Sequence, residues 1–537
     1  MNKRLRNFNG ITLVALVITI VILLILSGIS ISILTQTGLF GKAKQAQQRS
    51  EEAQGHEEAE LGKYEEEINK YTTTRSDGIH ADGSWNSSKK VNSPELMDGM
   101  TGIYWDDSGN EITVTADNQD NWYDYENQKW ANAKTQDGSY WVWIPRYAYK
   151  IESGCYTSTA GTITVKFLQG TSNKDSNNLE MNITYPEVKN GVMQDFVVHP
   201  SFTNGNKTAE EIASGEIPFG NGEWRENIAG YWVAKYAAGF QASTTDASDA
   251  TKVINGNDTI VYSDEKYTTN NTYRATAISG RAIANTGMSY PVFKPLTYAY
   301  NCITTGESYT LSRKIATATN FYGLNSSKTD SHLIKNSEWG AVAYLAQSSY
   351  GRNGTEISMN SKNLNNLNSK YICAVTGYSD EIANGIDAST TNNMSGVFDM
   401  RGCVWERTAA YITNGDENLK YGLSLVVTTI ANLDGYKTLS TEYATVYPYD
   451  DKSLGTTYNS KKSSTYGFGD AILETSERTT NMDGWNQDYS YYPYLTYSFF
   501  ARGGSCGISI PYTGSFAFNR AGGAGSYNGF RSVLIAL

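Results

Sequence analysis

The chain has 537 residues, a mass of 59.2 kDa and a formal net charge of −11, with 39% hydrophobic and only 18% charged residues. This hydrophobic content can form a folded core, which excludes a chain that is disordered throughout. The only basic cluster lies at the N-terminus, so the charge also excludes general binding to a phosphate backbone, and we expect no nucleic-acid partner.

Cysteine and histidine are too scarce and too scattered for the usual metal sites. The five cysteines include no CxxC pair, and no two histidines have the spacing of a metal-binding helix. We therefore expect no structural metal and at most one or two disulfides among Cys155, Cys302, Cys373, Cys403 and Cys506.

The N-terminal region predicts a membrane anchor. Lys3, Arg4 and Arg6 precede residues 11–34, which contain no charged residue. As a helix this stretch is about 36 Å long, enough to cross a hydrocarbon core of about 30 Å. Positive charges before the span and the acidic stretch 51–67 after it place everything beyond the span outside the cell. We expect a single-pass protein of the cell membrane with an extracellular C-terminal region.

The junction around Gly10 and Ile11 resembles the leader of type IV prepilins, a short basic peptide ending in Gly before a hydrophobic helix. The resemblance covers about the first 35 residues and implies cleavage after Gly10 and methylation of Ile11. The Glu usual at the fifth mature position of that family is replaced by Ala15. Without that carboxylate, pilus assembly lacks its intramembrane partner. A simple uncleaved anchor is an equally open interpretation.

Residues 36–71 are rich in good helix formers and predict a helical stalk. Leu61, Tyr64, Ile68 and Tyr71 follow a heptad seam, so self-association through the stalk stays open. Beyond Tyr71 the composition changes to Gly, Asn, Ser, Thr and Tyr, and we expect a small β-rich linker region over residues 72–136.

Short strands then dominate the predicted elements. Strands are expected at residues 111–115, 140–144, 161–168, 230–235 and 258–262. The best helix pattern is 335–348, where Trp339, Val342, Ala343 and Ala346 share a face. Residues 503–507 match the G-x-S-x-G string of a hydrolase nucleophile, but no histidine follows them to complete a triad.

Three motifs late in the chain resemble the formylglycine-generating enzyme (sulfatase-modifying factor) family, which has a C-type-lectin-like fold. They are S-G-V-F-D-M-R-G-C-V-W-E at 395–406, F-A-R-G-G-S at 500–505 and N-G-F-R-S-V at 528–533. Residues 141–149, 231–236 and 336–339 resemble its upstream strands and helix. The resemblance covers residues 137–537 and implies an α+β, loop-rich C-type-lectin-like domain after the transmembrane helix and stalk. Trp405, Arg502 and Arg531 are interpreted as framework that anchors the fold and bridges backbone carbonyls.

The same comparison argues against catalysis. Enzymatic members hold copper with two cysteines, and the matching positions are Ile508 and Thr513, which cannot bind a soft metal as thiolates do. The four histidines supply no iron cluster. Glu406 is the one residue that matches a calcium ligand, since Cys403 replaces the family's Asn. We expect no enzyme activity, no catalytic residue and no cofactor, with calcium left open.

A closer resemblance is to the variable proteins of diversity-generating retroelements, which use this fold as a binding scaffold. Their C-terminal frame of Arg, Gly and Phe is matched by Arg502, Gly503, Gly504, Gly507, Gly514, Phe516, Phe518, Gly523, Phe530, Arg531 and Val533. The resemblance implies that the residues between them form one exposed ligand-binding face: Ser505, Cys506, Ile508, Ser509, Tyr512, Thr513, Ser515, Ala517, Asn519, Arg520, Ala521, Ser526, Tyr527 and Asn528. An ordinary Gly-rich terminal loop is the simpler alternative.

These observations predict a membrane-anchored extracellular protein that binds an unidentified protein or glycan. A metal-dependent oxidase of the sulfatase-modifying type and a minor pilin or pseudopilin head are the alternatives.

Overall fold

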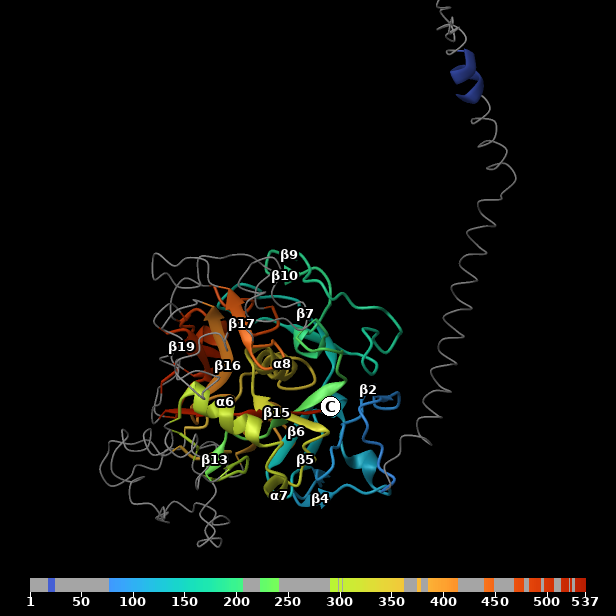
Figure 1. Cartoon of the computed structure of the whole chain (residues 1–537). Coiled ribbons are helices and arrows are strands. Elements are labelled where there is room, and N and C mark those ends of the chain that lie inside the picture. Colours follow the sequence, from blue (N-terminus) through green and yellow to red (C-terminus); the bar gives the residue numbers. More distant parts are fainter. Residues whose placement is uncertain are drawn as a thin grey trace, which may run out of the picture. The chain divides into compact units, whose positions relative to one another are not determined.

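The computed structural model divides into two compact units, Met1–Thr73 and Thr74–Leu537. In the first unit it describes only residues 18–24, which are helical (Figure 1). No helix within the described residues is long and apolar enough to cross a membrane. The cleavage site Gly10–Ile11, most of the expected span 11–34 and the stalk lie outside them. The described residues are 18–24, 77–205, 223–240, 290–297, 299–301, 303–361, 374–377, 385–413, 439–448, 468–477, 482–493, 497–506, 513–520, 522–523 and 527–537.

The second unit is of the α+β class, with mostly strands and few helices (Figure 1). Its largest sheet is antiparallel and has the order β15-β21-β12-β6-β5-β3-β4. These strands are Thr329–Leu333, Ser532–Ala536, Gly230–Ala234, Tyr140–Pro145, Asn132–Lys134, Thr101–Trp105 and Glu111–Thr113. Three of them come from the region expected to be a separate linker. These three strands pair with β6 and with one another in one sheet, within the compact unit Thr74–Leu537.

A second, five-stranded sheet is built around β16 (Trp405–Thr413). It pairs in parallel with β17 (Thr445–Pro448) and β20 (Asn528–Phe530), and antiparallel with β18 (Phe499–Gly503). β18 in turn pairs with β19 (Gly514–Arg520). Since β20 belongs to this sheet and β21 to the first, the single residue between them, Arg531, joins the two sheets.

The remaining elements are short. The other strands are β1 (Trp85–Asn86), β2 (Val91–Asn92), β7 (Tyr147–Ile151), β8 (Ile163–Phe167), β9 (Val188–Lys189), β10 (Val192–Met193), β11 (Val197–Val198), β13 (Gly239–Phe240) and β14 (Pro291–Val292). The helices are α6 (Thr305–Lys314), α7 (Thr319–Tyr322), α8 (Asn336–Gln347) and the 3-10 turns η1 (Gln119–Asn121), η2 (Tyr125–Asn127), η3 (Pro200–Phe202), η5 (Ile386–Ala388) and η8 (Trp485–Gln487).

Most of the predicted elements are confirmed. The strands expected at 111–115, 140–144, 161–168 and 230–235 correspond to β4, β6, β8 and β12, while 258–262 lies outside the described residues. The helix expected at 335–348 is α8. All of its residues are buried, not only the predicted face, because β8, β16 and η3 pack against it (Figure 1).

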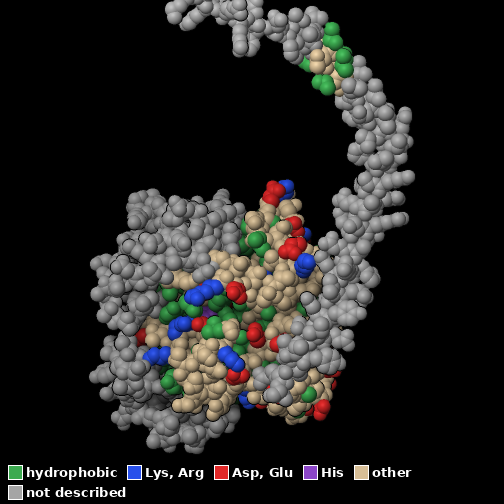
Figure 2. All heavy atoms as spheres, turned by 45° about the vertical axis from the view of Figure 1, so that its right-hand side comes forward, with side chains coloured by type: hydrophobic (Ala, Val, Ile, Leu, Met, Phe, Trp, Pro, Cys, Tyr) green, Lys and Arg blue, Asp and Glu red, His purple; other side chains and the backbone are tan. Residues whose placement is uncertain are grey.

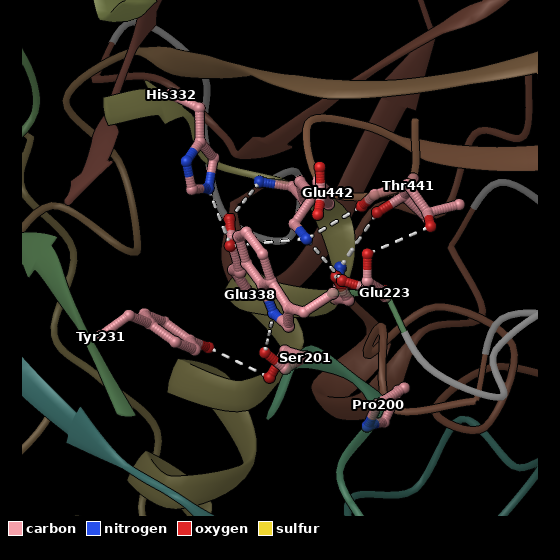
Figure 3. A network of polar contacts seen from close by, with 12 residues as sticks. Pro200, Ser201, Glu223, Tyr231, His332, Glu338, Thr441 and Glu442 are labelled. Carbon is pink, nitrogen blue, oxygen red and sulfur yellow. Dashed lines mark hydrogen bonds and ion pairs between the residues drawn. The ribbon is translucent and has the colours of Figure 1, made fainter. Parts of the chain in front are cut away.

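A chain of alternating charges fixes the start of α8 (Figure 3). The Nε2 atom of buried His332 lies 2.9 Å from Oε1 of Glu338, and Nζ of Lys335 lies 2.6 Å from Oε2 of Glu223. Burial alone lowers the pKa of His332, but the carboxylates of Glu338 and Asp330 raise it above its ordinary value. Each buried charge thus has a partner of opposite sign, which limits the cost of removing it from water.

Gly340 tests how tightly α8 is packed. A Cβ on this residue would lie 1.9 Å from the carbonyl oxygen of Gly469. Alanine gains about 1 kcal/mol in helix propensity over glycine, but the helix would have to shift. We expect Gly340→Ala to lower the free energy of unfolding by about 2–3 kcal/mol, measured by urea denaturation. Gly523→Ala, whose Cβ would meet nothing within 4 Å, is the control; equal stability of the two variants would contradict the packing argument.

Candidate ligand-binding face

The framework of the C-terminal region rests on a buried ion pair. Nε and Nη2 of Arg531 donate to the two carboxylate oxygens of Glu406 at 2.8 and 2.6 Å. The same guanidinium donates to the carbonyls of Ala234 and Phe398 at 2.7 Å each. One side chain therefore connects β12, β16 and the segment before β16, and the predicted framework role of Arg531 is confirmed.

Arg502 has the corresponding role under β19. Its guanidinium donates to the carbonyls of Ala517, Asp470 and Ala471 at 2.8–3.1 Å. Trp339 of α8 donates its indole N–H to the carbonyl of Ser515 at 2.8 Å. The prediction that Arg502 bridges several carbonyls is also confirmed, and β19 is held against the helix through its backbone.

The expected single exposed face is only partly formed. Five of the predicted residues are buried, namely Ser505, Cys506, Thr513, Ser515 and Ala517. Four are at least partly accessible, namely Asn519, Arg520, Tyr527 and Asn528. Ile508, Ser509, Tyr512, Ala521 and Ser526 lie outside the described residues.

The correction has a packing cause. β19 is covered on both sides: Phe516 packs on Trp485 with ring centroids 5.0 Å apart, and Ala517 lies in a cluster with Trp405 and Ala501. Ser515 and Ala517, which the sequence suggested as small residues that contact a ligand, are small because the neighbouring tryptophan rings leave no room for larger side chains. Thr513 is buried against Gly504, where a Cβ would meet the Thr513 side chain at 2.5 Å. The strand reaches the surface only at Asn519 and Arg520.

Tyrosines that the sequence reasoning did not select lie beside these accessible residues. Arg520 stacks on Tyr491, with its Cζ 3.4 Å from the ring centroid, and also donates to the Tyr491 hydroxyl. Tyr497, 45% exposed, lies 5.7 Å from the Arg520 guanidinium, and the Tyr489 ring is 5.6 Å from that of Tyr491. The Tyr-rich run at 489–492 was the available signal in the sequence.

The tyrosines also reach the start of β20. The Tyr489 ring lies 6.0 Å from that of Trp405, whose backbone N–H donates to the carbonyl of Tyr527 at 2.7 Å. Tyr527 is 38% exposed. We call the accessible set the aromatic rim: Tyr489, Tyr491, Tyr497, Asn519, Arg520, Tyr527 and Asn528.

A pair of carboxyl groups lies under the start of β19. Asp488 accepts the backbone N–H of Phe516 at 3.2 Å, while Arg401 lies 3.2 Å from Glu356 and donates to the carbonyl of Thr513. Burial raises the pKa of Glu356 to about 7 although Arg401 opposes the shift, and burial together with Glu356 raises that of Asp488. The raised pKa values favour protonation of this pair over two free carboxylates.

The metal groups implied by the resemblance do not fit these residues. Thr513 donates its hydroxyl to the sulfur of Met359, and burial raises the pKa of the Cys403 thiol well above its ordinary value, which disfavours the thiolate needed for copper. Both oxygens of Glu406, the residue matching a calcium ligand, are occupied by Arg531. Among the described residues no group of three His, Cys, Asp or Glu side chains could hold a metal ion.

Comparison of the chain with models of known protein families and with curated proteins finds no match to either.

The buried ion pair provides a stability test. We expect Arg531→Met to lower the free energy of unfolding by about 3–5 kcal/mol, because Glu406 and the carbonyls of Ala234 and Phe398 would be left buried without their partner. In the control Lys189→Met, the exposed pair of Lys189 with Glu187 at 2.8 Å is broken, and we expect a loss below about 1 kcal/mol. Urea denaturation of both variants makes the comparison, and similar losses would contradict the framework role of Arg531.

The carboxyl pair predicts a pH dependence. A carboxyl whose pKa is raised on folding contributes stability that is present below its unfolded pKa, 4.5 for Glu356, and is lost as the pH rises through its folded value of about 7. We expect Glu356→Gln to reduce the loss of stability between about pH 5 and about pH 8, measured by urea denaturation. Glu126→Gln, at an exposed position, should leave the slope unchanged. An unchanged slope for Glu356→Gln would show that the carboxyl is not protonated in the folded state.

Proposed function

We propose that this protein is a non-catalytic binding protein, anchored in the cell membrane and facing outward, whose C-terminal region has a C-type-lectin-like fold and recognises an extracellular protein or glycan. The order of the three motifs supports this proposal, because their Arg and Trp residues serve as buried framework. The uncharged stretch 11–34 and the basic residues before it support the anchor.

The aromatic rim carries the proposal. Frame residues such as Phe518, Phe530 and Val533 are fully buried, while tyrosines, an arginine and two asparagines remain accessible beside them. Tyrosine offers a large rigid contact area at low entropic cost, and asparagine offers adaptable hydrogen bonds. A fixed scaffold that presents these side chains has the chemistry of a recognition surface rather than of a reaction centre. Diversification by a retroelement is part of this proposal for the rim and for the intervening residues of the C-terminal motif.

Two other functions have less support. A metal-dependent oxidase needs thiolates where Thr513 and Ile508 stand. Metal-dependent turnover of a thiol-containing peptide that is lost in Cys506→Ala would nevertheless establish it. A minor pilin needs prepilin processing, which mass spectrometry of the native N-terminus would reveal as a methylated Ile11.

The binding role is tested with rim variants. Full-length protein in detergent is applied to arrays of glycans and of extracellular proteins, and we expect Tyr497→Ala and Tyr527→Ala to lose the captured ligand because the rings are the exposed contact area. Since surface substitutions change stability by only about 0.5 kcal/mol, folding should be unaffected. Tyr290→Ala, at another exposed tyrosine, is the control and should retain binding. Ligand capture that survives both rim substitutions would refute the assignment.

A further inference from the structure

Cys403 and Cys506 are brought together although about a hundred residues separate them in the chain. The backbone N–H of Cys506 donates to the carbonyl of Cys403 at 3.0 Å, and that of Gly402 donates to the carbonyl of Gly503 at 3.0 Å. Both cysteines are buried in one small apolar cluster, with Ala237, Ala299, Ala374 and Val404. Two backbone hydrogen bonds thus hold the two segments side by side.

This arrangement suits a disulfide. The backbone hydrogen bond from Cys506 to Cys403 brings the two main chains into direct contact, as the Cα separations of about 4.4–6.8 Å at which disulfides form require. Both side chains are reduced thiols in the structure. Cys403 also has a left-handed backbone with φ +57°, a conformation that Gly or Asn adopts more readily. A function of the thiol would explain why a cysteine stands at this position.

We propose that Cys403 and Cys506 form a disulfide that ties the segment before β16 to the segment after β18. Each thiol loses a proton and an electron as the sulfur–sulfur bond forms, and the disulfide of a thiol oxidant is reduced to two thiols. The inference rests on the proposed function only for the oxidising location outside the cell, where such bonds persist.

The disulfide would lie directly before residues 507–512, which belong to the candidate binding region. Cys506 directly precedes residues 507–512, and Thr513 beyond them is held by Arg401. The disulfide would fix the position of Cys506, as the contact with Arg401 fixes that of Thr513.

The test uses reduced full-length protein in detergent, oxidised with glutathione disulfide. Thiols are alkylated in denaturant with iodoacetamide, and the peptides are mapped by mass spectrometry without reduction. We expect Cys403 and Cys506 to lose alkylation together and to appear in one linked peptide, while Cys155, in a different cluster, stays alkylated. In Cys403→Ala the thiol of Cys506 should become alkylated again, and reduction should lower the Tm of the wild type but not of this variant.

Retained alkylation of both residues, or a link from Cys506 to Cys302 or Cys373, would overturn the proposal. Mapping of the wild type alone decides this if the variant fails to fold. Protein isolated from its own cells separates the two proposals: a link that forms with glutathione disulfide but is absent in cells supports the pairing and refutes the outward location.

Discussion

The contact between Arg531 and Glu406 is the constraint on which the rest of the C-terminal region depends. β20 pairs with β16 in the five-stranded sheet, and β21 pairs with β12 and β15 in the seven-stranded sheet. Arg531 is the only residue between β20 and β21, and its guanidinium contacts both sheets. A buried charge requires a partner of opposite sign, so separating the two sheets would either expose the Arg531 guanidinium or leave it buried without Glu406. The aromatic rim is positioned by this junction, since Tyr527 and Asn528 lie directly before it.

The burial of β19 changes which residues can recognise a ligand. In a strand with one solvated face, alternate residues would be accessible. Here α8 and Trp485 cover one side and Trp405 covers the other, so Ser515 and Ala517 are packing residues. The accessible residues lie instead at the end of the strand and among the tyrosines of 489–497. The proposed binding surface is therefore assembled from three separate parts of the chain.

The sequence predicted individual elements better than it predicted their partners. The apolar runs in 140–144 and 230–235 identified β6 and β12 because their local patterns are strong. The pairing of β12 with β21, about three hundred residues later, has no local signal. Motif resemblance compensated where the residues were framework, as with Arg502 and Arg531. The resemblance did not predict which residues are exposed, because the identity of a small residue does not show whether it faces water or packs against a tryptophan.

The buried carboxyl groups make the charge of the folded protein at neutral pH less negative than the formal value of −11. Burial raises the pKa of Glu95, Glu356 and Asp470 to about 7 each, so these carboxyl groups are partly protonated at neutral pH although the formal count takes them as charged. On the described part of the face in Figure 2, acidic and basic side chains are interspersed. The field that a ligand meets is thus weaker than the composition indicates. The recognition proposed for the aromatic rim would therefore depend on ring contacts and hydrogen bonds more than on long-range steering, which requires a surface of one sign.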